Sequence, residues 1–355
     1  MIDSSDYASI KNRTFKFFQA LPKVDLHRHL EGSLRISTLV EVARAHGLDI
    51  IGTGQLRSLV QVHEGEPFTF QNFLSKFGTL RLFYRSSDII ERVTYEAIAD
   101  AAADNVHHLE LRFTPAALCV AQGFSLAEVI RWVSETAQRA SQDYGITTSL
   151  IASINRHESL KTAEEVVQLV VDCKGQGLVG VDLAGNEAQF SAKPFVELFK
   201  EAKRAGLFIS VHAGEWGGPA NVAEAIVEFG AHRIGHGVRV MEDPQVVELA
   251  RDSGCAFEVC VTSNHQSGVV TNLSNHPLPR MLAAGLNVTI NTDDPSVSQI
   301  RLSDEYRLVT EILGLTVGTL QQRILAAAAA AFIPPPSRLA LVDSISDDFS
   351  KLKLA

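Results

Sequence analysis

The chain has 355 residues, of which 46% are hydrophobic and 21% charged, and its formal net charge is −9. The apolar content excludes an intrinsically disordered protein. The acidic balance argues against a protein that binds nucleic acids or other polyanions along an extended surface. The longest uninterrupted apolar run, Ile324 to Ile333, is too short to span a bilayer and is typical of a tightly packed helix.

The N-terminal segment contains no apolar stretch of the kind found in secretory signals. The four cysteines include no C-x-x-C pair and indicate no disulfide framework. We therefore expect a protein of the reducing cytoplasm.

Short β-rich runs alternate with longer segments of helical periodicity along the whole chain. In chain order, the strands are expected at Lys23–His29, His107–Phe113, Thr147–Asn155, Val179–Ala184, Phe208–His212, Arg233–His236, Ala256–Thr262 and Leu286–Asn291. Eight strands that alternate with helices predict an α/β protein whose parallel sheet closes into a single (β/α)8 TIM barrel. The alternative, an open doubly wound sheet, usually carries a glycine-rich phosphate turn after an early strand, and none follows the first strand here.

This barrel is expected to occupy residues 1–355 as one domain, with its core over about residues 20–335. The first ~20 residues are expected to form a helix before the first strand. The segment from Pro334 onward is expected to be a short C-terminal appendage and not a second domain.

Two helix starts and one ion pair can be predicted from local patterns. Ser125–Glu128 and Thr162–Glu165 have the spacing of capping boxes, in which two side chains satisfy free backbone N–H groups at the start of a helix. Glu110 and Arg112 share one face of the second strand, and we expect them to form a buried ion pair beneath the barrel rim.

An apolar stripe is formed by Phe70, Phe73, Leu74 and Phe77, which follow the i, i+3, i+4, i+7 spacing of one helix face. Taken alone, such a stripe is typical of core packing. It can also serve as the apolar wall of a pocket.

Two histidines mark the first strand as a candidate metal site. His27 and His29 alternate on the strand, so their side chains point the same way near its carboxyl end. In a parallel barrel that end opens into the active-site mouth. Two imidazoles with this spacing can share one metal ion.

Similar groups recur at the ends of three other strands, at His212, His236 and Asp293-Asp294. Each has an ordinary structural explanation, since a histidine can be a hydrogen-bonded core residue and an Asp-Asp-Pro segment can be a turn. Their convergence on one rim instead predicts a zinc shell with room for water. From the residues alone, His236 could be either a ligand or a catalyst.

The same segments indicate one metal ion and not two. Two-metal barrels need a bridging carboxylate, often a carboxylated lysine, near the middle strands. The fourth expected strand ends in Ala184-Gly185 and offers no lysine. The cysteine-ligated zinc deaminases are also excluded, because the chain has no P-C-x-x-C segment.

The sequence resembles the adenosine deaminase family of the amidohydrolase superfamily, which also contains adenine deaminases. The resembling segments occur in family order over about residues 20–335. They are Leu21–Gly32 (LPKVDLHRHLEG), Leu109–Pro115 (LELRFTP), Val181–Gly185 (VDLAG), Val211–Glu215 (VHAGE), Arg233–Gly237 (RIGHG) and Asn291–Pro295 (NTDDP).

The resemblance implies one zinc ion per chain, held by His27, His29, His212 and Asp293. It implies catalytic roles for Glu215, His236 and Asp294. Glu215 would donate a proton to N1 of a 6-aminopurine, His236 would orient the attacking water, and Asp294 would accept from the water or bond the N7 side. The residues implied to contact the substrate are Gly185, Asp294, Glu31, His29, Phe73 and Phe77. In this family the Phe70–Phe77 helix covers the pocket, so we expect a lid.

The implied reaction is hydrolytic deamination of adenosine and 2′-deoxyadenosine to inosine, 2′-deoxyinosine and ammonia. Glu31 stands where adenosine deaminases commonly carry Asp and adenine deaminases commonly carry Glu. Conversion of adenine to hypoxanthine, or of another 6-aminopurine, is therefore the alternative. A carboxylate at this position disfavours a 5′-phosphate, because two negative groups repel in a partly desolvated pocket.

Two further readings come from other classes of function. A metal-dependent sensor barrel without turnover would lack a catalytic residue, whereas Glu215, His236 and Asp294 are all present. Hydrolysis of another ring C–N bond is possible on the same site, since a fold does not determine a substrate. The expected partner is a small-molecule 6-aminopurine nucleoside or base, with no nucleic acid and no membrane. The sequence is compatible with a monomer or a homo-oligomer.

Overall fold

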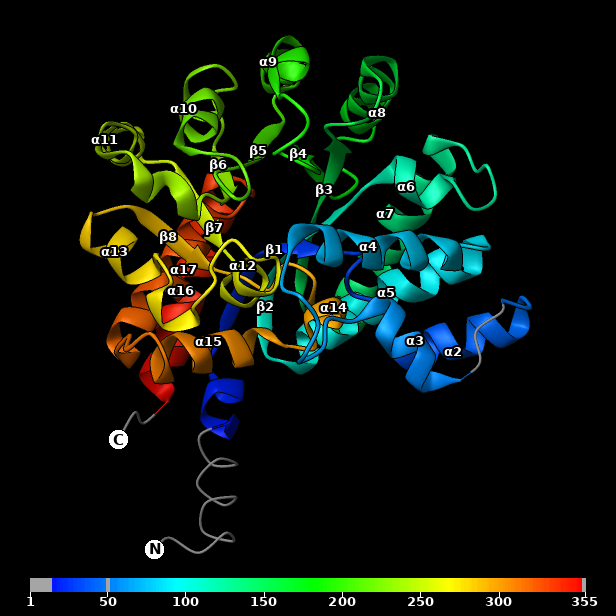
Figure 1. Cartoon of the computed structure of the whole chain (residues 1–355), viewed down its shortest axis with the longest axis horizontal. Helices are drawn as coiled ribbons and strands as arrows, with labels where there is room; N and C mark the ends of the chain where they lie inside the picture. The colour runs from blue at the N-terminus through cyan, green and yellow to red at the C-terminus, as the bar shows by residue number, and fades with distance from the viewer. Residues whose placement is uncertain (1–14, 49–51, 353–355) are drawn as a thin grey trace, which may run out of the picture.

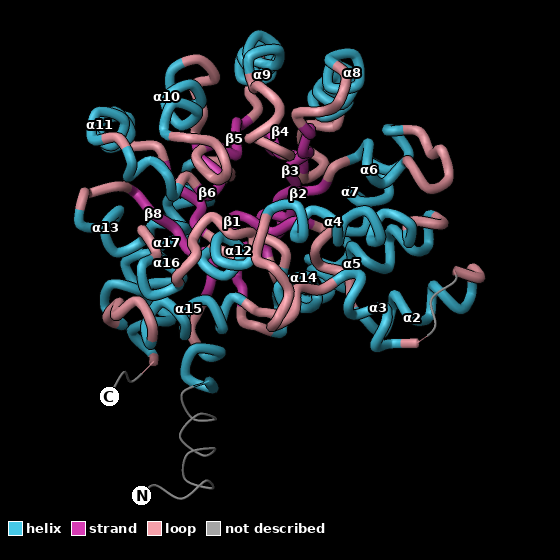
Figure 2. The backbone as a smooth tube through the Cα atoms, in the orientation of Figure 1, coloured by secondary structure: helices cyan, strands magenta, loops and turns pink. Residues whose placement is uncertain are grey.

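The computed structural model describes residues 15–48 and 52–352. Eight parallel strands pair in chain order, from β1 to β8, and Figures 1 and 2 show them enclosed by helices. The strands are β1 (Lys23–His29), β2 (Val106–Phe113), β3 (Thr147–Asn155), β4 (Leu178–Ala184), β5 (Phe208–Ala213), β6 (Arg233–His236), β7 (Ala256–Val259) and β8 (Asn287–Ile290). The predicted (β/α)8 TIM barrel is confirmed.

Helices follow each strand. Between β1 and β4 they are α2 (Ile36–Ala45), α3 (Thr53–Val60), α4 (Phe70–Leu80), η1 (Arg81–Phe83), α5 (Ser87–Ala103), α6 (Pro115–Cys119), α7 (Leu126–Tyr144) and α8 (Leu160–Asp172). Between β4 and β8 they are η2 (Lys193–Phe195), α9 (Val196–Arg204), α10 (Pro219–Val227), η3 (Val238–Glu242), α11 (Pro244–Ser253), α12 (Val261–Gln266), η4 (Leu273–Asn275) and α13 (Leu278–Ala283). After β8 come α14 (Pro295–Ser298), α15 (Leu302–Glu311), α16 (Val317–Ala330) and α17 (Pro335–Lys351).

The barrel closes between its last and first strands just beyond the end of β8. A parallel bridge joins Asp293 to Arg28. The backbone N–H of Asp293 donates to the carbonyl of His27 at 2.7 Å, and the N–H of His29 donates to the carbonyl of Asp293 at 2.8 Å. The residues predicted to bind metal from the first and last strands therefore also join the two edges of the sheet.

The strand predicted to run to Thr262 ends earlier, because a helix begins there. β7 stops at Val259 and α12 starts at Val261. The buried Glu305 carboxylate of α15 accepts hydrogen bonds from the backbone N–H groups of Val261 and Thr262. It therefore satisfies free donors at the start of α12. This cap comes from a distant helix, so the local sequence carries no sign of it.

One of the two predicted capping boxes is correct. Ser125 caps α7 and forms the reciprocal bonds with Glu128. The prediction at Thr162 is wrong, because α8 begins at Leu160 and its cap is Ser159, whose hydroxyl accepts from the Thr162 N–H. Ser159 and Thr162 both precede acidic residues and could each cap a helix. The helix starts after the first of the two, Ser159.

Both ends of the described chain are helical. Residues 15–20 form a helix directly before β1, while the rest of the predicted N-terminal helix lies outside the described residues. The expected C-terminal appendage is the helix α17, which buries Ile345 and Phe349. The longest apolar run lies in α16 from Ile324 to Ala330, with Ala327 and Ala328 buried as expected of a tightly packed helix. Within residues 15–48 and 52–352, no helix is long and apolar enough to cross a bilayer.

Candidate active site

A cavity of about 310 Å³ opens where the strands end. Asn155 and His236, the last residues of β3 and β6, lie in its wall. The cavity is also lined by nearly all the predicted site residues: His29, Glu31, Phe73, Phe77, Gly185, His212, Glu215, His236, Asp293 and Asp294. The exception is His27, which is fully buried on β1 next to this wall.

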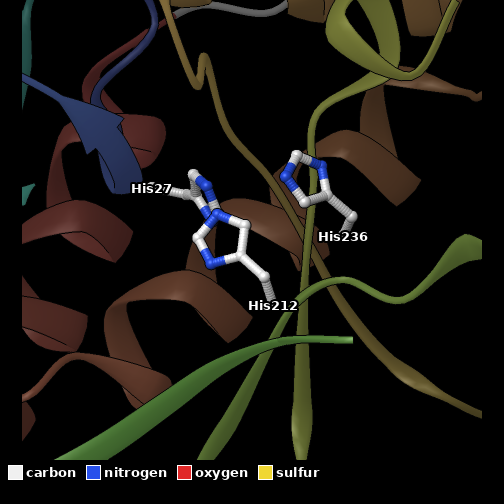
Figure 3. Close-up of side chains that lie close together, drawn as sticks. All are labelled: His27, His212 and His236. Carbon is white, nitrogen blue, oxygen red and sulfur yellow. The ribbon is translucent and has the colours of Figure 1, made fainter. Parts of the chain in front are cut away.

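Four imidazoles converge at the base of the cavity. The centroid of the His27 ring lies 5.2 Å from that of His29, 4.7 Å from that of His212 and 4.8 Å from that of His236. Figure 3 shows the rings of His27, His212 and His236, which come from three different strands. Residues separated by more than 180 positions in the chain are therefore brought within reach of one ion.

The spacing of the donor atoms matches a tetrahedral zinc shell. Nε2 of His27 and Nε2 of His29 lie 3.3 and 3.4 Å from Oδ1 of Asp293. Tetrahedral ligands at about 2.0–2.1 Å from zinc are separated by about 3.3–3.4 Å. Among the described residues, three groups of donor atoms each have all their pairs within 4.8 Å: His27 with His212 and His236, His27 with His29 and Asp293, and His236 with Cys260 and Asp293. The groups overlap at one place, because His27, His236 and Asp293 each belong to two of them. The residues therefore fit a single divalent ion.

Buried carboxylates orient two of these imidazoles from behind. Nδ1 of His27 lies 2.7 Å from Oε2 of Glu258, and Nδ1 of His212 lies 3.1 Å from Oδ1 of Asp182. Burial alone would raise the pKa of Asp182, but the neighbouring His212 and Arg112 hold it below its usual range. An ionised carboxylate that accepts from Nδ1–H leaves Nε2 free to bind a metal.

Two positions at the site adopt backbone conformations that L-residues rarely occupy. The φ angles of His236 and Asp293 are 58° and 66°. Each lies at or just beyond a strand end, where the chain turns sharply into the rim. Such strain is typical of functional sites.

The predicted proton donor lies in an environment that keeps it protonated. Glu215 is buried, and its Oε2 lies 3.7 Å from Nε2 of His236. Burial raises the pKa of Glu215 well above its usual range, and the neighbouring carboxylates of Asp293 and Glu187 add to the increase. Burial likewise raises the pKa of Asp294, assisted by Asp293 and Glu31.

Glu187, on the loop after β4, was missed by the sequence analysis. Its two carboxylate oxygens accept from the backbone N–H groups of residues 214, 215, 216 and 217 at 2.7–3.0 Å, and from the amide of Asn221 at 2.8 Å. This buried carboxylate therefore holds the loop that carries Glu215. One glutamate in a loop gives no local signal of such a role.

Close backbone approaches explain two glycines of the recognised segments. A Cβ on Gly32 would lie 1.8 Å from Oδ1 of Asp294, so only glycine lets Glu31 and Asp294 share this wall. Gly185 has φ +91° and lines the cavity, so it makes the tight strand-to-loop turn and leaves its backbone beside the ligand space. Gly185 can therefore both form this turn and contact a substrate.

The aromatic stripe does form one wall of the cavity. Phe73, Leu74 and Phe77 of α4 line it, as the lid prediction requires. Phe70 instead packs against Trp216, with ring centroids 5.6 Å apart. Trp216 and Arg81 also line the cavity, and neither was identified from the sequence.

The expected ion pair between Glu110 and Arg112 is replaced by longer-range pairs. Glu110 pairs with Arg233, and Arg112 pairs with Glu258 at 2.8 Å and with Asp182 at 3.4 Å. Side chains that alternate on one strand extend toward partners across the barrel, so the closest opposite charges come from other strands. Both residues are buried, as predicted.

Known proteins are similar to this chain over most of its length. The pattern of the family described as adenosine deaminase matches residues 22–348. An adenosine deaminase from Aliivibrio fischeri (strain MJ11) is 35% identical over 325 residues, which cover 91% of this chain and 97% of that protein.

Solved structures share the fold. The adenine deaminase from Arthrobacter aurescens has a TM-score of 0.86 at 27% identity, over 93% of this chain and 99% of that one. An amidohydrolase from Burkholderia ambifaria, with bound Zn, has a TM-score of 0.87 at 25% identity, over 99% and 94% of the two chains. The sequence pattern, the relatives and the fold agree, and the chain therefore belongs to the adenosine deaminase family.

Proposed function

We propose that this protein is a zinc-dependent hydrolase that deaminates adenosine and 2′-deoxyadenosine to inosine and 2′-deoxyinosine, with release of ammonia. The observation that carries the proposal is the convergence of four imidazoles and Asp293 at one cavity, which is also lined by the buried Glu215. Relatives of similar length at 35% identity are adenosine deaminases, which supports the same reaction.

His27, His29, His212 and Asp293 would hold the zinc ion. The donor atoms of His27 and His29 lie at tetrahedral separations from the Asp293 carboxylate, and Glu258 and Asp182 orient the imidazoles of His27 and His212. When bound, zinc lowers the pKa of its water from 15.7 to about 7 and so provides hydroxide at neutral pH.

The side chains of the cavity would donate and transfer the protons of the reaction. Glu215, kept protonated by burial, donates to purine N1 and so makes C6 accept the water oxygen. Glu215, ionised by that transfer, takes the proton of the hydroxyl formed at C6 and passes it to the amino nitrogen, which leaves as ammonia while the oxygen remains as the 6-oxo group. The other proton of the water returns to Glu215 for the next turnover. His236 orients and polarises the water, and Asp294 accepts from the water or bonds the N7 side.

Glu31 would decide which substrate enters. Its Oε1 accepts from the backbone N–H of Thr114 at 2.6 Å, while Oε2 is buried without a hydrogen-bond partner among the described residues. A ribose 5′-hydroxyl would supply the missing donor. A 5′-phosphate would be repelled by the carboxylate. The alternative substrate, free adenine, is favoured by the glutamate itself, since adenine deaminases commonly carry Glu here.

The cytoplasm is the proposed location. It is supported by the cysteines, which indicate no disulfide framework.

The test compares kcat/KM for adenosine, 2′-deoxyadenosine, adenine and AMP, using purified enzyme whose zinc content has been measured. We expect both nucleosides to be preferred over adenine and AMP by at least about tenfold, the ratio that 1.4 kcal/mol of binding free energy provides. A higher value for adenine would establish the alternative. A protein that binds no divalent metal would contradict the proposed site itself.

A further inference from the structure

A chain of three hydrogen bonds connects a backbone amide to the far side of the His236 ring. The N–H of Leu278, at the start of α13, donates to Nδ1 of His276 at 3.1 Å. Nε2 of His276 lies 3.3 Å from Oδ1 of Asn264. Nδ2 of Asn264, on α12, lies 3.1 Å from Nδ1 of His236. His236, Asn264 and His276 are all buried.

The first bond determines the proton position on His276. A backbone N–H can only donate, so Nδ1 of His276 must be the acceptor. Burial lowers the pKa of His276 to about 3, so the ring is neutral and has one proton. That proton must be on Nε2, which therefore donates to Asn264.

The second bond determines the orientation of the Asn264 amide. An amide carbonyl accepts and an amide NH2 donates, and only Oδ1 can accept the His276 proton. The NH2 group is then directed at His236, where it can only donate. Nδ1 of His236 must therefore be an acceptor without a proton.

We propose that Asn264 and His276 are positioning residues that fix His236 in the tautomer carrying its proton on Nε2. Nε2 faces the cavity, 3.7 Å from Oε2 of Glu215 and 3.8 Å from Oδ2 of Asp293. In this tautomer His236 donates a hydrogen bond to the attacking oxygen and does not take its proton. The proton then passes to a carboxylate of the cavity. The catalytic consequence rests on the proposed function, whereas the tautomer itself does not.

The direct test is a long-range ¹H–¹⁵N correlation spectrum of the full-length, zinc-loaded enzyme labelled on histidine. His236 is assigned by the signal that disappears in His236→Gln. We expect a bare Nδ1 and a protonated Nε2 at neutral pH. A proton on Nδ1 in the wild-type enzyme overturns the proposal, and this measurement requires no folded Asn264 variant.

The decisive substitution is Asn264→Asp, which keeps the shape but replaces the donor with an acceptor. We expect the His236 proton to appear on Nδ1 and kcat to fall by about 10²–10⁴-fold, as a wrong histidine tautomer does in other hydrolases. KM and zinc stoichiometry should stay near the wild-type values. Unchanged kcat with a relocated proton would overturn the catalytic role.

Ser263→Ala is the matched control. Ser263 is a fully buried neighbour on α12 whose hydroxyl has no hydrogen-bond partner among the described residues. We expect wild-type spectra and wild-type turnover, because this residue is outside the hydrogen-bond chain. If no 6-aminopurine is deaminated but the His236 spectrum is as expected, the proposed function fails and the tautomer assignment stands.

Discussion

Two adjacent layers of the barrel handle buried charge in opposite ways. In the layer beneath the cavity, each charge has an opposite charge beside it. Arg233 pairs with Glu110 and with Glu258 at 2.5 Å, and Arg112 also pairs with Glu258. Burial would raise the pKa of Glu258, but the two arginines hold it well below its usual range. These charges stabilise each other and the positions of the strands.

At the rim, acidic groups lie beside one another. Glu215, Asp293, Asp294 and Glu31 line one cavity, and burial raises the pKa values of Glu215, Asp294 and Glu31. Such an arrangement is costly unless a cation, a proton or a substrate hydrogen bond completes it. Buried charges with opposite partners therefore belong to the structural layer of this barrel. Buried acids without such partners belong to the candidate active site.

The largest effect should come from the rim. Glu215→Gln removes the proton donor but preserves shape, and we expect turnover to fall by about 10³-fold, within the range for general acid–base catalysis. Zinc content and the free energy of unfolding should not decrease, because a crowded buried acid has been removed. Glu158→Gln is the control, since Glu158 is a half-buried glutamate with a raised pKa that does not line the cavity. Unchanged turnover in Glu215→Gln would eliminate the proposed donor.

Substitutions in the layer beneath the cavity should lower the free energy of unfolding. Arg233→Met leaves Glu110 and Glu258 without their shared partner, and removing one member of a buried pair typically costs about 3–5 kcal/mol. The free energy of unfolding can be measured by urea titration. Arg131→Met is the control, because the Arg131–Glu135 pair is exposed on α7 and should contribute almost nothing. Equal stability of the two variants would refute the contrast between the layers.

The lid should show a smaller effect that separates binding from folding. Phe77→Ala removes a partly buried wall of the cavity, so we expect KM for adenosine to rise about tenfold with little change in Tm. Phe199→Ala is the comparison, because Phe199 is fully buried against Phe229. It should destabilise by about 3–5 kcal/mol without raising KM. A Phe77 variant that loses stability but keeps its KM would place Phe77 in the core.

Much of the site was predictable because it depends on local pattern and topology together. The alternation of His27 and His29 on one strand indicates a shared face. A parallel barrel brings all strand ends to one mouth, so motifs at His212, His236 and Asp293 must meet there. Two errors occurred where distant groups decided a local outcome, as Glu305 does for the start of α12 and Arg233 does for the partner of Glu110. The third was local, because Ser159 and not Thr162 caps α8.

By itself, the sequence determined the eight strands, the barrel class, the family and most of the residues that meet at the rim. Period-two patterns and strand-end motifs involve residues close together in the chain, so they can be recognised in the sequence alone. Only the tertiary structure decided the partners of those residues. It joined Asp293 to β1, placed Glu187 under the Glu215 loop and paired Arg233 with Glu110 across 123 positions. Such contacts depend on how strands and loops are arranged around the barrel axis, and no local stretch of sequence specifies that arrangement.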